Sequence, residues 1–197
     1  MNPKPPRNPV ILVHGIFDTT AIFNTMSAYL TERGWEVHSF DLIPNTGLMT
    51  LDKLAVQLEN YIAQGFSPDQ PLDLVGFSMG GIVSRYYVQR LGGIERIQRF
   101  ITISSPHRGT WVAYLYVLPA AAQMRPNCSF LNDLNQDIQM LEKLKFTSIW
   151  TPYDAMIVPA NSSQVPVGEE WQVDVMVHAW MVNDRRTLER VEQALNS

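Results

Sequence analysis

Four short apolar runs constrain what this chain can fold into. They cover residues 10–13, 37–42, 72–77 and 100–103, and each is rich in β-branched or aromatic residues and bounded by turn-forming residues. Their hydrophobicity is continuous rather than alternating, so we expect both faces of each strand to be buried. Strands of this kind are typical of a parallel sheet covered by helices.

Helical patterns separate these runs. Three of them end at or next to a glycine: 21–33, 51–64 and 79–91. The second half continues with expected strands at 146–150 and 171–177 and an amphipathic helix at 184–195. The alternation predicts an α/β fold with a doubly wound, mostly parallel sheet of about six strands, helices on both faces, and active groups at the carboxyl ends of the strands.

Length and composition favour one domain. A chain of 197 residues, 46% of them hydrophobic, can bury a full core without disulfides or metal. We therefore predict a single domain over 1–197. Residues 106–145 are the irregular part, and we expect them to form one or two helices in a small cap or lid over the site.

Charge and cysteine content exclude several classes of protein. The formal net charge is −4 and the basic residues are scattered, which disfavours a nucleic-acid partner. Cys128 is the only cysteine, so neither an intramolecular disulfide nor a paired-cysteine metal cluster can form. Residues 1–9 lack the apolar core of a signal peptide, and the apolar stretch 111–124 is too short to span a bilayer, so we expect a cytoplasmic protein. The oligomeric state is left open.

Residues 76–80 read Gly-Phe-Ser-Met-Gly, which matches the pattern G-x-S-x-G between an expected strand and an expected helix. Small residues at both ends allow a sharp turn that exposes the hydroxyl of Ser78. A serine hydroxyl is a poor nucleophile without a neighbouring base, and a helix N-terminus favours developing negative charge. Ser78 is therefore the candidate nucleophile.

The loop after the first strand is the candidate oxyanion site. His14-Gly15 closes that strand beside the expected serine turn. A tetrahedral intermediate requires two backbone N–H donors aimed at its oxyanion. We assign these donors to Ile16 and Met79, with Phe17 as the alternative to Ile16.

Four histidines compete for the role of base: His14, His38, His107 and His178. In folds that present a serine on such a turn, the chain order is serine, acid, histidine, which disfavours His14 and His38. His178 follows the last expected strand, where a carboxyl-end loop would present it. We interpret His107 as a side chain that braces the turn after residue 103.

The acid is sought between the serine and the histidine. Asp154 comes just after the expected strand 146–150 and is our choice to orient the imidazole. Asp133 and Asp137 fall in the expected cap, and Asp174 falls inside an expected strand. Each of these three could simply face solvent.

These residues resemble a known family, the small and nearly minimal bacterial lipases of the α/β-hydrolase superfamily. The resemblance rests on His178 and four blocks of sequence: 9–16, 76–81, 104–110 and 153–159. It implies Ser78 as nucleophile, Asp154 as acid, His178 as base and backbone donors at Ile16 and Met79, with no cofactor.

Two departures from that family concern the pocket and metal binding. Phe77 stands where such lipases usually have His. Some larger relatives bind calcium, but their ligand aspartates have no counterpart here, so we predict no metal.

The apolar segment 111–124 suggests an acyl substrate. It would serve equally as a lid or acyl-chain wall and as a buried helix over the sheet. We expect Phe17, Phe77, Trp111 and Tyr114 to contact the substrate, and the same segment suggests transient contact with a membrane or lipid surface.

The predicted activity is hydrolysis of acyl esters, notably lipids, by a serine esterase or lipase that forms an acyl-enzyme. The same residues could serve an acyltransferase or a thioesterase. A non-catalytic protein that binds apolar ligands on the hydrolase scaffold is the alternative from another class.

Overall fold

The computed structural model describes residues 7–197 and contains a six-stranded sheet whose strands are all parallel. The strand order is β2-β1-β3-β4-β5-β6. The strands are β1 (Val10–Val13), β2 (Val37–Phe40), β3 (Leu72–Phe77), β4 (Ile97–Ile103), β5 (Lys145–Trp150) and β6 (Glu169–Gln172). The doubly wound parallel sheet expected from the apolar runs is confirmed.

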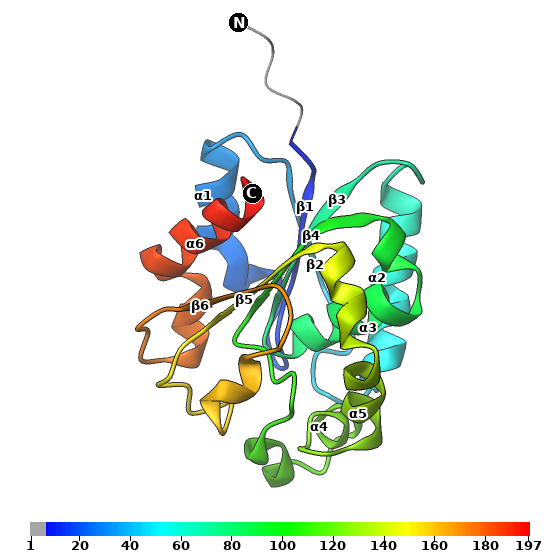
Figure 1. The fold of residues 1–197 in the computed structure, drawn as a ribbon, viewed down its shortest axis with the longest axis vertical. Coiled ribbons are helices and arrows are strands. Elements are labelled where there is room, and N and C mark those ends of the chain that lie inside the picture. The colour runs from blue at the N-terminus through cyan, green and yellow to red at the C-terminus, as the bar shows by residue number, and fades with distance from the viewer. Residues whose placement is uncertain (1–6) are drawn as a thin grey trace, which may run out of the picture.

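Four helices cover the two faces of this sheet (Figure 1). The helices α1 (Asn24–Glu32) and α6 (Arg185–Leu195) lie on one face, and α2 (Leu51–Gly65) and α3 (Met79–Arg90) lie on the other. Neighbouring side chains of β1 point to opposite cores: Ile11 and Val13 pack with α2 and α3, and Val10 and Leu12 pack with α1 and α6. Burial on both faces explains why the strands read as continuous apolar runs.

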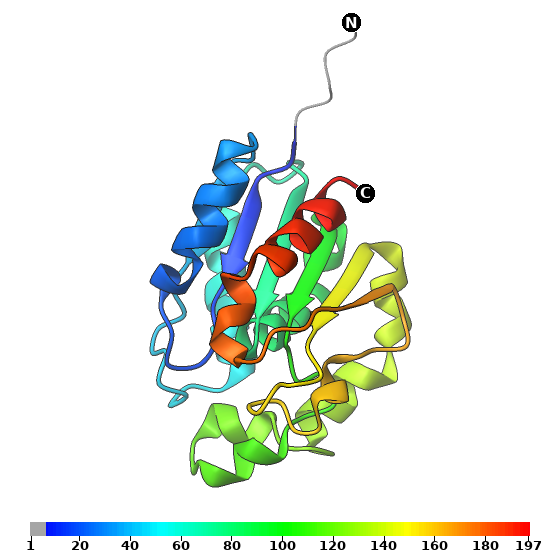
Figure 2. The same ribbon diagram turned by 90° about the vertical axis from the view of Figure 1, so that its left-hand side faces the viewer.

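The strand order places a crevice at the carboxyl edge of the sheet. After β1 the chain adds β2 on one side of β1, and it later adds β3 on the other side. The loops that follow β1 and β3 therefore lead away in opposite directions and leave a crevice between them at the carboxyl ends of these strands. The segment between β4 and β5 extends past this edge, at the bottom of Figure 2. This segment, which we call the cap, comprises the 3₁₀ helices η3 (Trp111–Leu115) and η4 (Ile138–Lys143) and the helices α4 (Pro119–Gln123) and α5 (Ser129–Gln136).

The strand expected at 171–177 is the main correction to the predicted elements. The structure ends β6 at Gln172, and one further backbone hydrogen bond joins Val173 N–H to the carbonyl oxygen of Trp150. The chain then turns, because Val175 N–H donates back to the carbonyl oxygen of Val173. Val173 and Val175 are buried in the core beside α6 although they lie beyond the end of β6. Their hydrophobicity reflects this packing, and for that reason the strand expected from hydrophobicity was too long. Asp174 consequently lies in a loop.

Candidate active site

Ser78 stands on a sharp turn between β3 and α3. Its backbone adopts φ 52° and ψ −122°, a combination that residues with a side chain seldom occupy. Small neighbours make the turn feasible. A Cβ built on Gly76 would lie 2.5 Å from Gly81 Cα, and one on Gly80 would lie 2.2 Å from the carbonyl oxygen of Val13. Backbone strain of this kind is concentrated at functional sites.

His178 and Asp154 lie beside Ser78 although both are distant from it in the sequence. His178 begins the 3₁₀ helix η6 (His178–Val182), and Asp154 lies in the loop after β5. The Nε2 atom of His178 is 2.9 Å from Ser78 Oγ. Its Nδ1 atom is 2.7 Å from Oδ2 and 2.9 Å from Oδ1 of Asp154. The structure therefore brings the three predicted side chains into one hydrogen-bonded chain.

The carboxylate of Asp154 is buried and well supplied with donors. The backbone N–H groups of Met156 and Ile157 each donate to Oδ1 at 2.9 Å. Burial by itself would raise the pKa of Asp154, but the hydrogen bond with His178 and these two N–H donors lower that pKa below its ordinary value. An ionised carboxylate favours the tautomer with a proton on Nδ1, which leaves Nε2 as an acceptor for the serine hydroxyl.

Two backbone N–H groups beside Ser78 have no acceptor within residues 7–197. They belong to Ile16 and to Met79, the first residue of α3, where a helix has no internal partner for its N–H groups. The N–H of Phe17, the alternative donor, is engaged because it donates to the carbonyl oxygen of Asn45 at 2.8 Å. The geometry therefore favours Ile16 over Phe17.

A narrow apolar cavity of about 50 Å³ opens beside Ser78. The loops after β1, β4 and β5 form its walls together with the cap. Its lining residues are Ile16, Phe17, Pro106, Thr110, Val112, Ala113, Tyr116, Ala121, Met124, Met156 and Ile157. An apolar chain attached to a reacting carbonyl fits this lining, because it leaves few polar groups without partners.

Of the four side chains expected to contact the substrate, only one lines the cavity. Phe17 lines the cavity. Trp111 and Tyr114 stack on each other with ring centroids 5.4 Å apart, and both are half exposed outside the lining. Phe77 does not reach the cavity, because its side chain is fully buried and packs against the imidazole of His178 at 4.8 Å between ring centroids. Phe77 therefore packs against the imidazole ring of His178 and helps to hold it in place.

The other candidate histidines are occupied elsewhere. His107 is fully buried, and its Nε2 lies 3.0 Å from Thr102 Oγ1, which agrees with its interpretation as a brace for the turn. Burial, helped by the positive charges of Arg85 and Arg108, holds the pKa of His107 well below its usual range. His14 is also fully buried, and its Nε2 accepts the N–H of Leu42 at 3.0 Å.

The alternative acids do not approach the imidazole. Asp133 and Asp137 form ion pairs with Arg90 of α3 at 2.9 and 2.7 Å, which hold the cap against the nucleophile helix. Asp174 is exposed, and Gln172 donates to it at 3.3 Å.

Asp18 lies near Ser78 and is not among the candidate residues predicted from the sequence. A Cβ built on Gly15 would lie 2.9 Å from Asp18 Oδ2 and 3.1 Å from Ser78 Cβ, so the carboxylate and the nucleophile flank the same glycine. Burial is the main cause that raises the pKa of Asp18 above its ordinary value. In the sequence, the one feature that could have indicated Asp18 is its position three residues after Gly15, in the candidate oxyanion loop.

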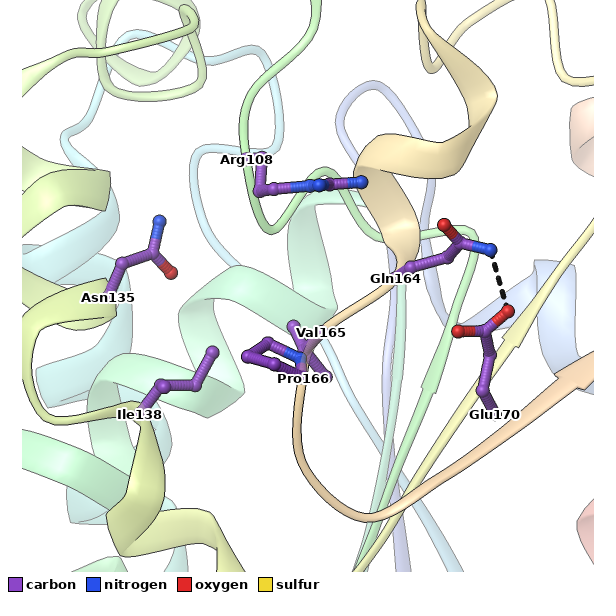
Figure 3. A pocket seen from close by; sticks show the side chains of 7 residues that line it. All are labelled: Arg108, Asn135, Ile138, Gln164, Val165, Pro166 and Glu170. Atoms are coloured by element: carbon purple, nitrogen blue, oxygen red, sulfur yellow. Dashed lines mark hydrogen bonds between the residues drawn. The ribbon is translucent and has the colours of Figure 1, made fainter.

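A second cavity, of about 470 Å³ and lined by both polar and apolar side chains, lies beside Arg108 (Figure 3). The sticks show Arg108 and Gln164 above a floor that includes Val165, and Gln164 Nε2 donates to Glu170 Oε1 at 2.6 Å. None of the three hydrogen-bonded side chains at Ser78 lines it. In residues 7–197, no group of three or more His, Cys, Asp or Glu side chains is arranged to hold a metal ion.

Comparison with known proteins gives one family match. The family profile described as palmitoyl protein thioesterase matches residues 9–119. The matched segment is more than half of the chain. It contains Ile16, Ser78 and Met79 but ends before Asp154 and His178.

Several solved structures share the fold. The mature lipase BlEst2 of Bacillus licheniformis has a TM-score of 0.74 and 18% identity, covering 98% of this chain and 94% of that chain. Aspergillus fumigatus lipase B has a TM-score of 0.79 and 18% identity, covering 97% of this chain and 53% of that chain. A lipase-esterase related protein from Clostridium acetobutylicum has a TM-score of 0.71 and 16% identity, covering 95% and 94%. The fold is thus the α/β-hydrolase fold, and the chain spans about half of the fungal lipase.

Proposed function

Since the chain belongs to the palmitoyl protein thioesterase family and has the α/β-hydrolase fold, we propose that it is a serine hydrolase that cleaves acyl esters, lipid esters among them. The observation that carries the proposal is the continuous set of hydrogen bonds from Asp154 through His178 to Ser78 Oγ, at 2.7 and 2.9 Å. In this proposal Ser78 is the nucleophile, His178 the general base and Asp154 the orienting acid.

Acylation begins when Ser78 Oγ attacks the carbonyl carbon of the ester. His178 Nε2 accepts the hydroxyl proton as the new C–O bond forms, and Asp154 stabilises the resulting imidazolium. The carbonyl oxygen becomes an oxyanion that accepts hydrogen bonds from the N–H groups of Ile16 and Met79. When the tetrahedral intermediate collapses, the alkoxide leaving group takes the proton from His178 and an acyl-Ser78 ester remains.

Deacylation repeats these steps with water. His178 removes a proton from the water, whose oxygen attacks the acyl carbon, and the same two N–H groups bind the second oxyanion. Collapse returns the proton to Ser78 Oγ and releases a carboxylic acid. If an alcohol replaced water, the same steps would transfer the acyl group instead.

A thioester is the second candidate substrate class. The family profile that matches residues 9–119 is named for a thioesterase, which favours this reading. The proposed chemistry differs only in the leaving group, because a thiolate needs less protonation by His178 than an alkoxide does. The apolar cavity beside Ser78 suits the acyl part of either substrate.

The test compares p-nitrophenyl esters of increasing chain length with the matching acyl thioesters. The wild-type protein is expected to hydrolyse at least one series, and Ser78→Ala is expected to remove the activity. A fluorophosphonate label located by mass spectrometry should attach to Ser78. A higher kcat/KM for thioesters at equal chain length would assign the protein to the thioesterases.

The non-catalytic alternative has a different outcome. If no ester or thioester turns over, Ser78 is not labelled, and a fluorescent fatty acid is nevertheless displaced by apolar ligands, the protein binds such ligands without acting on them.

A further inference from the structure

Exposed apolar side chains gather at one edge of the molecule. Within residues 7–197, fourteen large apolar side chains are exposed, and all except Val56 belong to loops that follow the carboxyl ends of strands or to the cap. The thirteen are Phe17, Ile43, Leu48, Trp111, Tyr114, Leu115, Val117, Tyr153, Met156, Val158, Met176, Val177 and Trp180, and we call them the apolar rim. Because all strands are parallel, these loops share the edge of the sheet at which Ser78 lies.

The most exposed members lie on the cap. Val117 is 96% exposed and Leu115 is 79% exposed. Single exposed apolar residues are ordinary, but a concentration at one edge marks an interaction surface. The cost of leaving these side chains in water is therefore offset when something apolar covers that edge.

Most of the apolar rim lies in stretches without formal charge, and only Phe17 and Tyr153 stand next to a charged residue, Asp18 and Asp154 respectively. Residues 42–51, 109–124, 155–168 and 175–183 contain no Asp, Glu, Lys or Arg, although 17% of the chain is charged. Arg125, which borders one of them, lies over the ring of Tyr114 at 4.8 Å. An anionic membrane surface is bound through clusters of Lys and Arg, and these segments supply none.

The apolar rim and the cavity beside Ser78 share two residues. Phe17 and Met156 are exposed and also line the cavity, so the rim reaches the mouth of the cavity. The rim also includes Trp111 and Trp180, and indole rings favour the boundary between lipid and water.

We propose that the apolar rim docks onto a neutral lipid surface, a bilayer of zwitterionic phospholipid, and so places the mouth of the cavity among acyl chains. The proposal deepens the proposed function and rests on it, because it names the surface that presents the substrate. A net charge of −4 opposes docking to anionic lipid.

The test uses vesicles of diether phosphatidylcholine, which contain no ester bond, so that binding is measured without hydrolysis. The wild-type protein is expected to sediment with them equally at low and high salt. Replacing part of the lipid with its phosphatidylglycerol analogue should not strengthen binding.

Val117→Asp is expected to weaken binding about tenfold or more, because burial of one such side chain contributes about that factor. Val56→Asp on α2 is the matched control, since it adds the same charge to an exposed valine outside the rim, and it should leave vesicle binding unchanged. Both variants should hydrolyse a soluble short-chain ester at the wild-type rate.

Three results would overturn the proposal. They are absence of sedimentation with neutral vesicles, binding that requires phosphatidylglycerol and is lost in high salt, and equal weakening by both variants. Self-association that is disrupted by Val117→Asp, without vesicle binding, would instead identify a protein-binding face. A protein that sediments but hydrolyses no ester or thioester would contradict the proposed function and leave the docking surface standing.

Discussion

Gly80, in the first turn of α3, lies directly against the end of β1. A Cβ at this position would be 2.2 Å from the carbonyl oxygen of Val13 and 2.4 Å from that of His14. The nucleophile helix can therefore approach the strand that leads to Ile16 only when residue 80 has no side chain. The spacing of the two N–H donors next to Ser78 depends on this contact.

Gly80→Ala is expected to lower the free energy of unfolding by about 1–3 kcal/mol, because backbone on both sides must move to admit the methyl group. Hydrolysis should fall further than stability alone explains, since Met79 moves with the helix. Thermal denaturation and kcat on a soluble ester measure the two effects.

Gly65→Ala is the control for this change. Gly65 is also helical, at the end of α2, and nothing lies within 4 Å of a Cβ built there. Alanine at this position should raise the free energy of unfolding by about 0.5–1 kcal/mol. Equal effects of the two substitutions would show that the contact between Gly80 and Val13 is not a close one.

Asp154→Asn should keep the fold and remove most of the activity. An amide can stabilise the wrong imidazole tautomer, so kcat is expected to drop by about three to four orders of magnitude with KM little changed. Asp174 is exposed and was an alternative candidate for the acid in the sequence. Asp174→Asn should therefore have the wild-type kcat. Comparable activity of both variants would refute the assignment of Asp154.

Asn45→Ala tests the support of the oxyanion loop. The Nδ2 atom of Asn45 donates to the carbonyl oxygen of Asp18 at 2.7 Å, two residues beyond Ile16. One such hydrogen bond contributes about 0.5–1.5 kcal/mol, so kcat should fall by up to about tenfold while KM stays near its wild-type value. Asn196→Ala removes a similar bond to the carbonyl oxygen of Glu192, far from Ser78, and should leave kcat unchanged.

Asp18→Asn should stabilise the protein increasingly as the pH rises above about 4. Because the pKa of Asp18 is raised in the folded state, folding favours its protonated form, and ionisation of the carboxyl costs stability at higher pH. The side chain is partly in water, so the gain in the free energy of unfolding is expected to stay below about 1 kcal/mol. At pH values below the ordinary pKa, the variant and the wild type should agree.

Denaturant titrations at several pH values measure this difference. Asp69→Asn, in the exposed turn between α2 and β3, serves as the control. A gain that is constant with pH would contradict the role given to ionisation of Asp18.

Most of the fold could be predicted because its determinants are local. Continuous apolar runs, helical periodicity and terminal glycines act between residues close in the chain, and they indicated β1, β3, α2, α3 and α6 to within a residue or two. The turn at Ser78 was predictable for the same reason, since Gly76 and Gly80 are only two residues away from the serine on either side. The order serine, acid, histidine along the chain, together with the position of each residue after an expected strand, then indicated Asp154 and His178. The structure brings both residues to Ser78.

Other features depend on contacts between distant segments, which the sequence by itself did not determine. Val173 and Val175 are buried by packing beside α6 rather than by strand pairing, so the end of β6 was misjudged. Phe77 lies under the imidazole and Asp18 beside the nucleophile because the sheet brings together the ends of separate strands. The apolar rim exists for the same reason: parallel strands carry five separate loops to one edge, and only the tertiary structure gathers their exposed side chains there.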